Sequence, residues 1–139
     1  MTIEETTDLA ACHALRRTVF IEEQSVPEAD EMDDLDEGAI HLLARDEAGR
    51  PVATARLLIK GDTGKIGRVC VLADQRGTGM GAALMQAAID ALIARGVREA
   101  HLGSQVHAMG FYERLGFVAE GPVYDDAGIP HRDMVRVIA

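Results

Sequence analysis

The stretch Gln75-Arg76-Gly77-Thr78-Gly79-Met80-Gly81-Ala82 decides how this chain can fold. It follows a short apolar run at 66–72 and opens a long apolar-periodic segment at 80–95. That order predicts a strand, a glycine loop and then a helix. The first N–H groups of such a helix carry partial positive charge and lack partners inside the helix, so they suit a phosphate. We therefore predict a diphosphate-binding loop.

Other types of glycine loop fit this stretch less well. A P-loop would continue with Gly-Lys-Ser or Gly-Lys-Thr, and this loop does not. A dinucleotide fingerprint needs a different glycine spacing and an acidic residue about twenty residues further on. A purely structural turn stays open as an alternative. The stretch does match Arg76-x-x-Gly79-x-Gly81, the acyl-CoA pyrophosphate signature Arg/Gln-x-x-Gly-x-Gly/Ala.

The flanking patterns predict an α/β domain with a mixed, mostly antiparallel sheet and a central β-α-β unit. Three consecutive strands separated by turn residues form an antiparallel meander. A crossover through the long helix, which stops at Gly96, makes the next strand parallel to the one before it. A helix capped by Asp8 or Thr7 and running to about Phe20 precedes the meander, and a short helix with Tyr112 on its apolar face follows. The predicted strands are 39–44, 52–60, 65–72, 100–104, 117–120 and 131–138.

Length and charge limit the function classes. A chain of 139 residues is expected to form one domain. Its net charge of −9 argues against nucleic acid as the main partner and is compatible with a cationic substrate. The acidic start resembles no signal peptide, and no apolar run is long enough for a membrane helix. We expect a cytoplasmic protein without a membrane partner.

The cysteines and histidines indicate no metal. Cys12 and Cys70 have no disulfide-framework or zinc spacing, and the histidines, 5 in number, lack metal-ligand spacing.

Acidic residues dominate positions 28–37. The simpler interpretation is a solvated loop. The sharper one is that a few of these carboxylates face a pocket and attract an amine. Arg56 and Arg68 could line the same pocket or pair with loop carboxylates, and we favour pairing.

Two motifs together resemble a known family. Residues 66–96 look like the central motif of the GNAT superfamily of acetyl-CoA-dependent N-acetyltransferases. Gln105-x-x-Ala108-x-x-x-Tyr112-x-x-x-Gly116-Phe117 resembles its second motif, Asn-x-x-Ala-x-x-x-Tyr-x-x-x-Gly-Phe, with glutamine replacing asparagine. The stretch Val19-Phe20-Ile21-Glu22-Glu23-Gln24, the pattern Glu28-x-Asp30-x-x-Asp33, His41, and Tyr124-x-x-x-Gly128-Ile129-x-His131-x-x-Met134 resemble the small ElaA-like branch.

The resemblance implies where acetyl-CoA would bind. Backbone groups of Val69 and Val71, with Cys70 between them, would hold the pantetheine arm. The region of Val71 would donate an N–H to the thioester oxygen. The amide of Gln105 would contact the coenzyme A arm, although its reach differs from that of asparagine. The diphosphate would lie on Arg76, Gly77, Thr78, Gly79, Met80 and Gly81, mostly through the backbone.

The resemblance also suggests catalytic and acceptor-binding residues. Tyr112 is the candidate general acid for the departing thiolate, although a tyrosine on an apolar helix face could equally be a core residue. Glu23 is the first candidate for the general base, followed by His41 and His131. With Phe20, these three residues form the expected acceptor site. Cys70 could be acetylated, but a small buried cysteine is the more common case.

The resemblance therefore predicts an N-acetyltransferase that transfers the acetyl group directly to the acceptor in a ternary complex. The acceptor would be a primary amine of a small molecule such as a polyamine or an amino sugar. A non-catalytic acyl-CoA-binding or regulatory module is the alternative, and a nucleotide-binding protein is a third. The edges of the C-terminal strands could pair two copies, which would give a homodimer.

Overall fold

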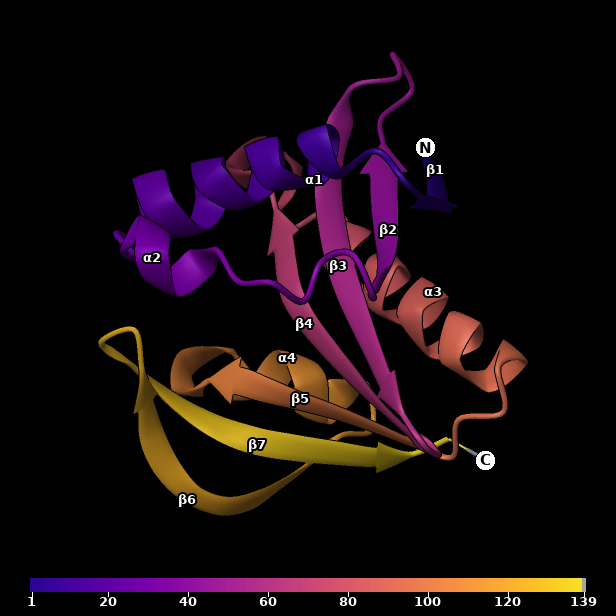
Figure 1. Cartoon of the computed structure of the whole chain (residues 1–139), viewed down its shortest axis with the longest axis vertical. Coiled ribbons are helices and arrows are strands. Elements are labelled where there is room, and N and C mark those ends of the chain that lie inside the picture. Colours follow the sequence, from indigo (N-terminus) through magenta and orange to yellow (C-terminus); the bar gives the residue numbers. More distant parts are fainter. Residues whose placement is uncertain (139) are drawn as a thin grey trace.

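The computed structural model describes residues 1–138 and is built on a seven-stranded sheet of order β1-β2-β3-β4-β5-β7-β6 (Figure 1). All neighbouring strands are antiparallel except β4 and β5, which are parallel. The predicted mixed α/β fold with a central β-α-β unit is confirmed. The strands are β1 (Thr2–Thr6), β2 (Ile40–Arg45), β3 (Pro51–Lys60), β4 (Thr63–Val71), β5 (Glu99–Gln105), β6 (Val118–Asp126) and β7 (Ile129–Val137).

Helices cover both faces of the sheet. Successive side chains of a strand point to opposite faces. In β2, Leu43 therefore packs with the α1 residues Cys12 and Leu15, whereas Leu42 and Ala44 belong to the core under α3. The helices and shorter turns are α1 (Leu9–Arg16), η1 (Arg17–Glu23), α2 (Glu28–Glu31), η2 (Ala73–Gln75), α3 (Met80–Ala94), η3 (Val106–Ala108) and α4 (Met109–Arg114).

The first helix begins as predicted and runs further than predicted. The Asp8 carboxylate accepts a hydrogen bond from the Ala11 N–H at 3.1 Å, which is the expected N-cap contact. After Arg16 the chain continues without a break into η1, a wider π-helical segment that ends at Glu23. The expected end at Phe20 is therefore three residues short. This extension positions Phe20 and Gln24 beside β4 and β5.

The long helix α3 packs tightly against the sheet. Its buried residues include Leu84, Ala88 and Leu92, spaced so that they share one face. Leu92 lies directly over Gly64 of β4, where a Cβ atom would come within 2.6 Å of the leucine side chain. Gly96, in the left-handed region with φ 76°, ends the helix as predicted.

Strands β4 and β5 separate soon after they begin to pair. Only Thr63, Gly64 and Lys65 have parallel partners on β5, although β4 continues to Val71. Figure 1 shows the two arrowheads ending well apart. Parallel strands that diverge leave backbone groups of both strands without a partner in the sheet. The divergence opens a wedge in the middle of the sheet.

The sequence patterns missed or shortened some elements. No strand was predicted at β1, which pairs with β2 at the edge of the sheet. The β6 strand reaches Asp126, well past the predicted end at 120. A bulge interrupts its pairing between Glu120 and Tyr124, around Pro122, and this break disguises the strand in the sequence.

Candidate active site

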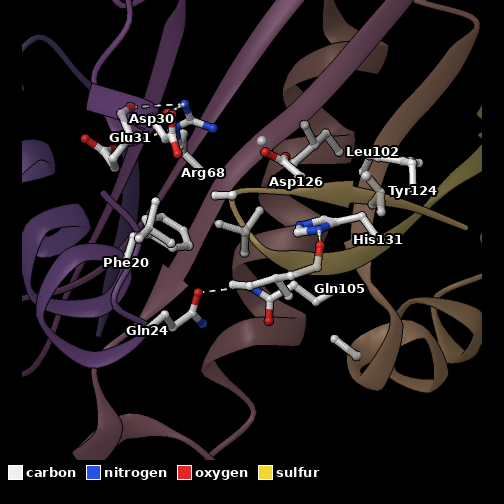
Figure 2. Close-up of a pocket in the computed structure, with 18 of the residues that line it drawn as sticks. Phe20, Gln24, Asp30, Glu31, Arg68, Leu102, Gln105, Tyr124, Asp126 and His131 are labelled. Atoms are coloured by element: carbon white, nitrogen blue, oxygen red, sulfur yellow. Dashed lines mark hydrogen bonds and ion pairs between the residues drawn. The ribbon is translucent and has the colours of Figure 1, made fainter. Parts of the chain in front are cut away.

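A cavity of about 310 Å³ lies in the wedge between β4 and β5. Its walls come from both strands, from the end of η1, from η3 and α4, and from the β6–β7 hairpin. The close-up in Figure 2 shows Phe20 and Gln24 on one side and Tyr124 and His131 on the other. Of the predicted site residues, this cavity is lined by Phe20, Val69, Gln105, Tyr112 and His131, and Glu23 does not line it.

A β-bulge turns β4 where it enters the cavity. Arg56 pairs with Gly67 and Thr54 with Cys70, so Ala55 alone opposes both Arg68 and Val69. Arg68 adopts a left-handed conformation with φ 51°, which is uncommon for a residue with a side chain. The bulge redirects the backbone of Val69 toward the wedge, beside the position predicted for the pantetheine arm.

The glycine loop has the backbone geometry of an anion cradle. Gly77 and Gly79 have φ values of 78° and 85°, and Gly79 is the N-cap of α3 without any side-chain cap. The first backbone hydrogen bond of α3 runs from the Ala83 N–H to the Gly79 carbonyl, at 3.0 Å. The N–H groups of Met80 and Gly81 precede it and have no acceptor inside the helix. The Thr78 hydroxyl donates to the Gln75 carbonyl at 2.5 Å and closes the loop.

Arg76 and Glu23 are paired at the entrance of this loop. Two Arg76 nitrogens donate to the Glu23 carboxylate at 2.6 and 2.9 Å, and Arg76 Nε donates to the Val71 carbonyl at 3.0 Å. The hydrogen bond from Arg76 lowers the pKa of Glu23. Glu23 lies outside the cavity walls, so the structure places the first candidate base beside the glycine loop instead.

Tyr112 lies in the cavity wall with its ring held by neighbouring aromatics. The Phe111 and Phe117 rings meet it edge-to-face, with centroids 5.0 and 6.2 Å away. Burial raises the pKa of Tyr112 to about 12, so its phenol stays protonated at neutral pH. A protonated phenol facing a cavity can donate a proton or a hydrogen bond.

Three amide and imidazole side chains link the two sides of the cavity. Gln105 Nε2 donates to Gln24 Oε1 at 2.9 Å, and His107 Nε2 lies 2.6 Å from Gln105 Oε1. Because an amide oxygen can only accept, His107 Nε2 is the donor. The bond from Gln105 joins β5 to the end of η1 across the wedge (Figure 2).

The histidines expected at the acceptor site are separated in the structure. His131 projects from β7 into the cavity, with Nδ1 2.8 Å from the Ile129 carbonyl. His41 is buried on β2, bonded through Nε2 to the Asp36 carbonyl at 2.8 Å, and borders a different pocket beside β1. The structure does not bring His41 to the cavity.

Buried ion pairs hold much of the segment 28–37. Arg16 bonds to Glu31 at 2.5 Å and to Asp36 at 2.9 Å. Arg56 bonds to Asp33 and Asp36 at 2.7 and 3.1 Å, so its predicted pairing with loop carboxylates is confirmed. The interpretation as a solvated loop holds for most of these side chains, and Asp33 is exposed although it pairs with Arg56 and Arg68. It is wrong for Glu31 and Asp36, which are buried or half-buried against arginines. We call Arg16, Arg56, Arg68, Glu31, Asp33 and Asp36 the charge network.

Arg68 both pairs and lines the cavity. Its Nη2 donates to the Glu31 carbonyl at 3.0 Å (Figure 2) and to Asp33 Oδ2 at 3.2 Å. The charge network therefore fixes one wall of the cavity as well as the acidic segment.

Cys70 is a buried core residue. It is 4% exposed and packs with Cys12 and Leu15. Burial raises the pKa of its thiol to about 12, so it is not a thiolate at neutral pH. This environment agrees with the simpler interpretation of the residue and gives a covalent route no support.

Residues 1–138 hold no group of three or more His, Cys, Asp or Glu side chains arranged for a metal ion, and the absence of a metal stays a prediction. Within the same residues, no helix combines the length and the apolar character that crossing a membrane requires.

The motif reading missed several residues of the cavity. Its walls also contain residues to which no role was given from sequence, namely Val26, Lys65, Leu102, Gly103, His107 and Asp126. Tyr124 stood in the quoted C-terminal pattern, which was a usable signal. Asp126 and Gly103 carried none, because only the register of β5, β6 and β7 brings them to the cavity.

Comparison with known proteins identifies the family of this chain. The family model described as "Acetyltransferase (GNAT) domain" matches residues 5–138. ElaA from Escherichia coli is 35% identical over 95% of this chain and 89% of its own length. YyaT from Bacillus subtilis is 37% identical over 95% and 90% of the two chains. The crystal structure of an acyl-CoA N-acyltransferase from Pseudomonas aeruginosa has a TM-score of 0.84 at 35% identity, covering 98% and 97%.

The chain belongs to the GNAT family of acetyltransferases. Its similarity to ElaA confirms the predicted ElaA-like branch. The enzyme class predicted from the sequence, an N-acetyltransferase, is confirmed as well.

Proposed function

We propose that this protein transfers the acetyl group of acetyl-CoA directly to a primary amine of a small molecule within a ternary complex. The observation that carries the proposal is the wedge between β4 and β5. It holds the cavity lined by Tyr112, and the chain runs from the end of β4 into the glycine loop that begins α3. Acetyl-CoA would supply an acetyl group activated as a thioester.

The residues present fit that co-substrate. The glycine loop offers N–H groups to a diphosphate, and a Cβ at Gly77 or Gly79 would be strained by the positive φ. The bulged backbone near Val69 and the amide of Gln105 border the path of the pantetheine arm. We expect the Val71 region to donate an N–H to the thioester oxygen, a contact that can contribute about 3 kcal/mol in the transition state.

The transfer requires two proton movements. The neutral amine nitrogen bonds to the carbonyl carbon and the carbon–sulfur bond breaks. As the amide forms, the nitrogen gives up one proton, which restores the Tyr112 hydroxyl through water once the tyrosine has protonated the sulfur. The departing sulfur takes a proton from the Tyr112 hydroxyl, which burial keeps protonated. Because Cys70 is buried and protonated, transfer without an acetylated cysteine is the simpler route.

We infer that the acceptor is cationic before reaction, such as a polyamine or an amino sugar. Asp30 and Asp126 line the cavity with exposed carboxylates from opposite elements, α2 and the β6–β7 hairpin. Phe20 adds an apolar surface beside them. Opposite charge at the cavity mouth would concentrate an ammonium substrate.

The test is coenzyme A release from acetyl-CoA with a set of polyamines, amino sugars and anionic acceptors. We expect turnover with the amines and a kcat about 10²- to 10⁴-fold lower in Tyr112→Phe. Acetyl-CoA should stabilise both proteins equally against heat, because phenylalanine keeps the ring packing. Activity confined to anionic acceptors would refute the proposal. Binding without turnover for any amine would favour the acyl-CoA-binding module, and stabilisation by ATP but not acetyl-CoA a nucleotide-binding protein.

A further inference from the structure

We propose that His131 is the general base that takes the proton from the acceptor amine, and that Tyr124, Asp133 and Gly103 hold it in position. The inference rests on the proposed amine acetylation. It assigns the base to a residue of the β6–β7 hairpin instead of to Glu23 of the first helical segment.

The hydrogen bond at Nδ1 fixes the tautomer of His131. Nδ1 lies 2.8 Å from the Ile129 carbonyl oxygen, which can only accept. Nδ1 therefore carries the hydrogen, and in the neutral ring Nε2 keeps its lone pair. Among residues 1–138, Nε2 makes no hydrogen bond, and Figure 2 shows the ring projecting into the cavity. A free imidazole nitrogen in a substrate cavity can accept a proton near neutral pH.

Tyr124 supports the ring from one side. The two rings are stacked, with centroids 5.9 Å apart and planes inclined by 25°. The residues are direct partners in the β6–β7 register. The Tyr124 hydroxyl in turn donates to Asp133 Oδ1 at 2.8 Å, so both ends of the tyrosine are held.

Gly103 makes this arrangement possible. It is the β5 partner of Asp133, and a Cβ atom at this position would lie 2.5 Å from the Tyr124 hydroxyl. Its φ is not in the left-handed region, so the glycine is needed here for space and not for backbone conformation. The pairing of β5 with β7 and of β6 with β7 brings Tyr124, His131 and Asp133 together.

The other titratable groups are less suited to the role. Glu23 is paired with Arg76 outside the cavity, and His41 is bonded to a carbonyl beside a different pocket. His107 lines the cavity, but its ring is exposed and donates to Gln105. The charged groups that share the cavity with His131 are Asp30, Glu31, Lys65, Arg68 and Asp126.

In the proposed step, an ammonium N–H bond breaks and its proton goes to His131 Nε2. The freed electron pair stays on the amine nitrogen, which then attacks the thioester. The imidazolium formed still donates its Nδ1–H to the Ile129 carbonyl, so the ring does not have to flip during the reaction. The proton leaves to water after transfer.

The experiment compares kcat/KM for an alkylamine from pH 6 to 9 in the wild type and in His131→Gln. We expect a loss of about 10²- to 10⁴-fold at pH 7 in the variant. The variant should recover about tenfold per pH unit as the free amine fraction grows, whereas kcat/KM of the wild type, in which His131 removes the proton, should rise less steeply over the same pH range. Added imidazole should partly restore His131→Ala.

Matched controls separate this role from a structural one. His107→Gln removes the other imidazole of the cavity and should keep the shape of the wild-type pH profile, whatever its effect on rate. Tyr124→Phe removes the bond to Asp133 but keeps a stacking ring, and should lower kcat more than it raises KM. Acetyl-CoA should still stabilise all variants against heat.

Two results would overturn the assignment. One is a His131→Gln profile that is parallel to the wild type at every pH, which indicates a structural role. The other is the recovery with pH appearing in Glu23→Gln instead. The proposed function fails separately, if the wild type itself acetylates no amine.

Discussion

Asp36 connects the acidic segment to α1 and β3. It accepts hydrogen bonds from Arg16, His13 and Arg56. Burial alone would raise the pKa of Asp36, but these bonds hold it well below its ordinary value of 3.8. A carboxylate with a lowered pKa stabilises the fold above its ordinary value, and that stabilisation is lost as the pH falls toward the folded value.

We expect Asp36→Asn to lower the free energy of unfolding at pH 7 by about 3 kcal/mol, because it leaves Arg16 and Arg56 short of a buried negative charge. The difference from the wild type should narrow as the pH falls below about 4. Urea unfolding from pH 7 to pH 3 measures both effects. Asp34→Asn, at an exposed neighbouring position, is the control and should change little. A constant difference across this range would contradict the prediction.

The Glu23 carboxylate is paired with the guanidinium of Arg76 in the glycine loop. Replacing it with Gln frees Arg76 for an incoming diphosphate, so acetyl-CoA should bind about two- to fivefold more tightly, as the strength of an exposed ion pair allows. Isothermal titration measures the Kd, with Glu22→Gln as the control at the adjacent exposed position. Weaker binding in Glu23→Gln would mean that the carboxylate orients Arg76 and does not compete for it.

At the scale of single residues, the sequence predicted best those positions whose role depends on the local backbone conformation. The glycine loop and Gly96 have the conformations expected of them, since positive φ is a local requirement that glycine meets. The site roles given to Tyr112, Gln105 and Phe20 stay predictions, although the cavity contains all three. The Glu23–Arg76 pair joins residues 53 apart, and no local pattern reports such a contact.

Among the elements, α3 and β4 meet at one narrow contact. We expect Gly64→Ala to destabilise the protein by about 1–3 kcal/mol, because its Cβ would lie 2.6 Å from Leu92 inside the core. The midpoint of urea unfolding measures the change. Gly67→Ala on the same strand is the control, because a Cβ there meets nothing within 4 Å. Equal effects of the two substitutions would mean that backbone propensity, and not the contact with Leu92, is responsible.

Elements with a strong apolar period were predicted best. The meander of β2, β3 and β4 and the helix α3 lie within a few residues of their predicted bounds. Their side chains face a core, which imposes the period. The edge strand β1 is mostly exposed and carries threonine and glutamate, so it has no such signal. The helix α2 is short and is held by arginines distant in sequence. The apolar periodicity of the sequence gives no sign of such contacts.

The molecule as a whole has two groups of strands, β1–β4 and β5–β7, joined in the sheet by the short pairing of β4 with β5. A ligand in the wedge would contact both. Acetyl-CoA at 100 times its Kd should add about 2.7 kcal/mol of stability. Hydrogen exchange should slow at residues 67–71 and 77–82, whereas β2 should change little beyond the global effect. Protection confined to the pocket beside β1 would contradict this placement.

Some expectations about the whole chain stay predictions. The cytoplasmic location and the single-domain organisation are untested, and so is a homodimer. The outer edge on the C-terminal side is β6, where the bulge and Pro122 interrupt the backbone pattern that a second copy would need. A dimer through this edge would therefore have to use the short stretches on either side of the bulge.

The charge network has a kinetic consequence. Its contacts join residues 15 to 37 positions apart and need α1, β3 and β4 to be in place first. We expect contacts between residues so far apart in the sequence to form after the folding barrier, so that they act mainly on the unfolding rate. The acidic segment would then dock last, on a sheet that has already formed, and would slow its unfolding. Loss of Asp36 should shorten the lifetime of the folded chain and leave its refolding rate almost unchanged.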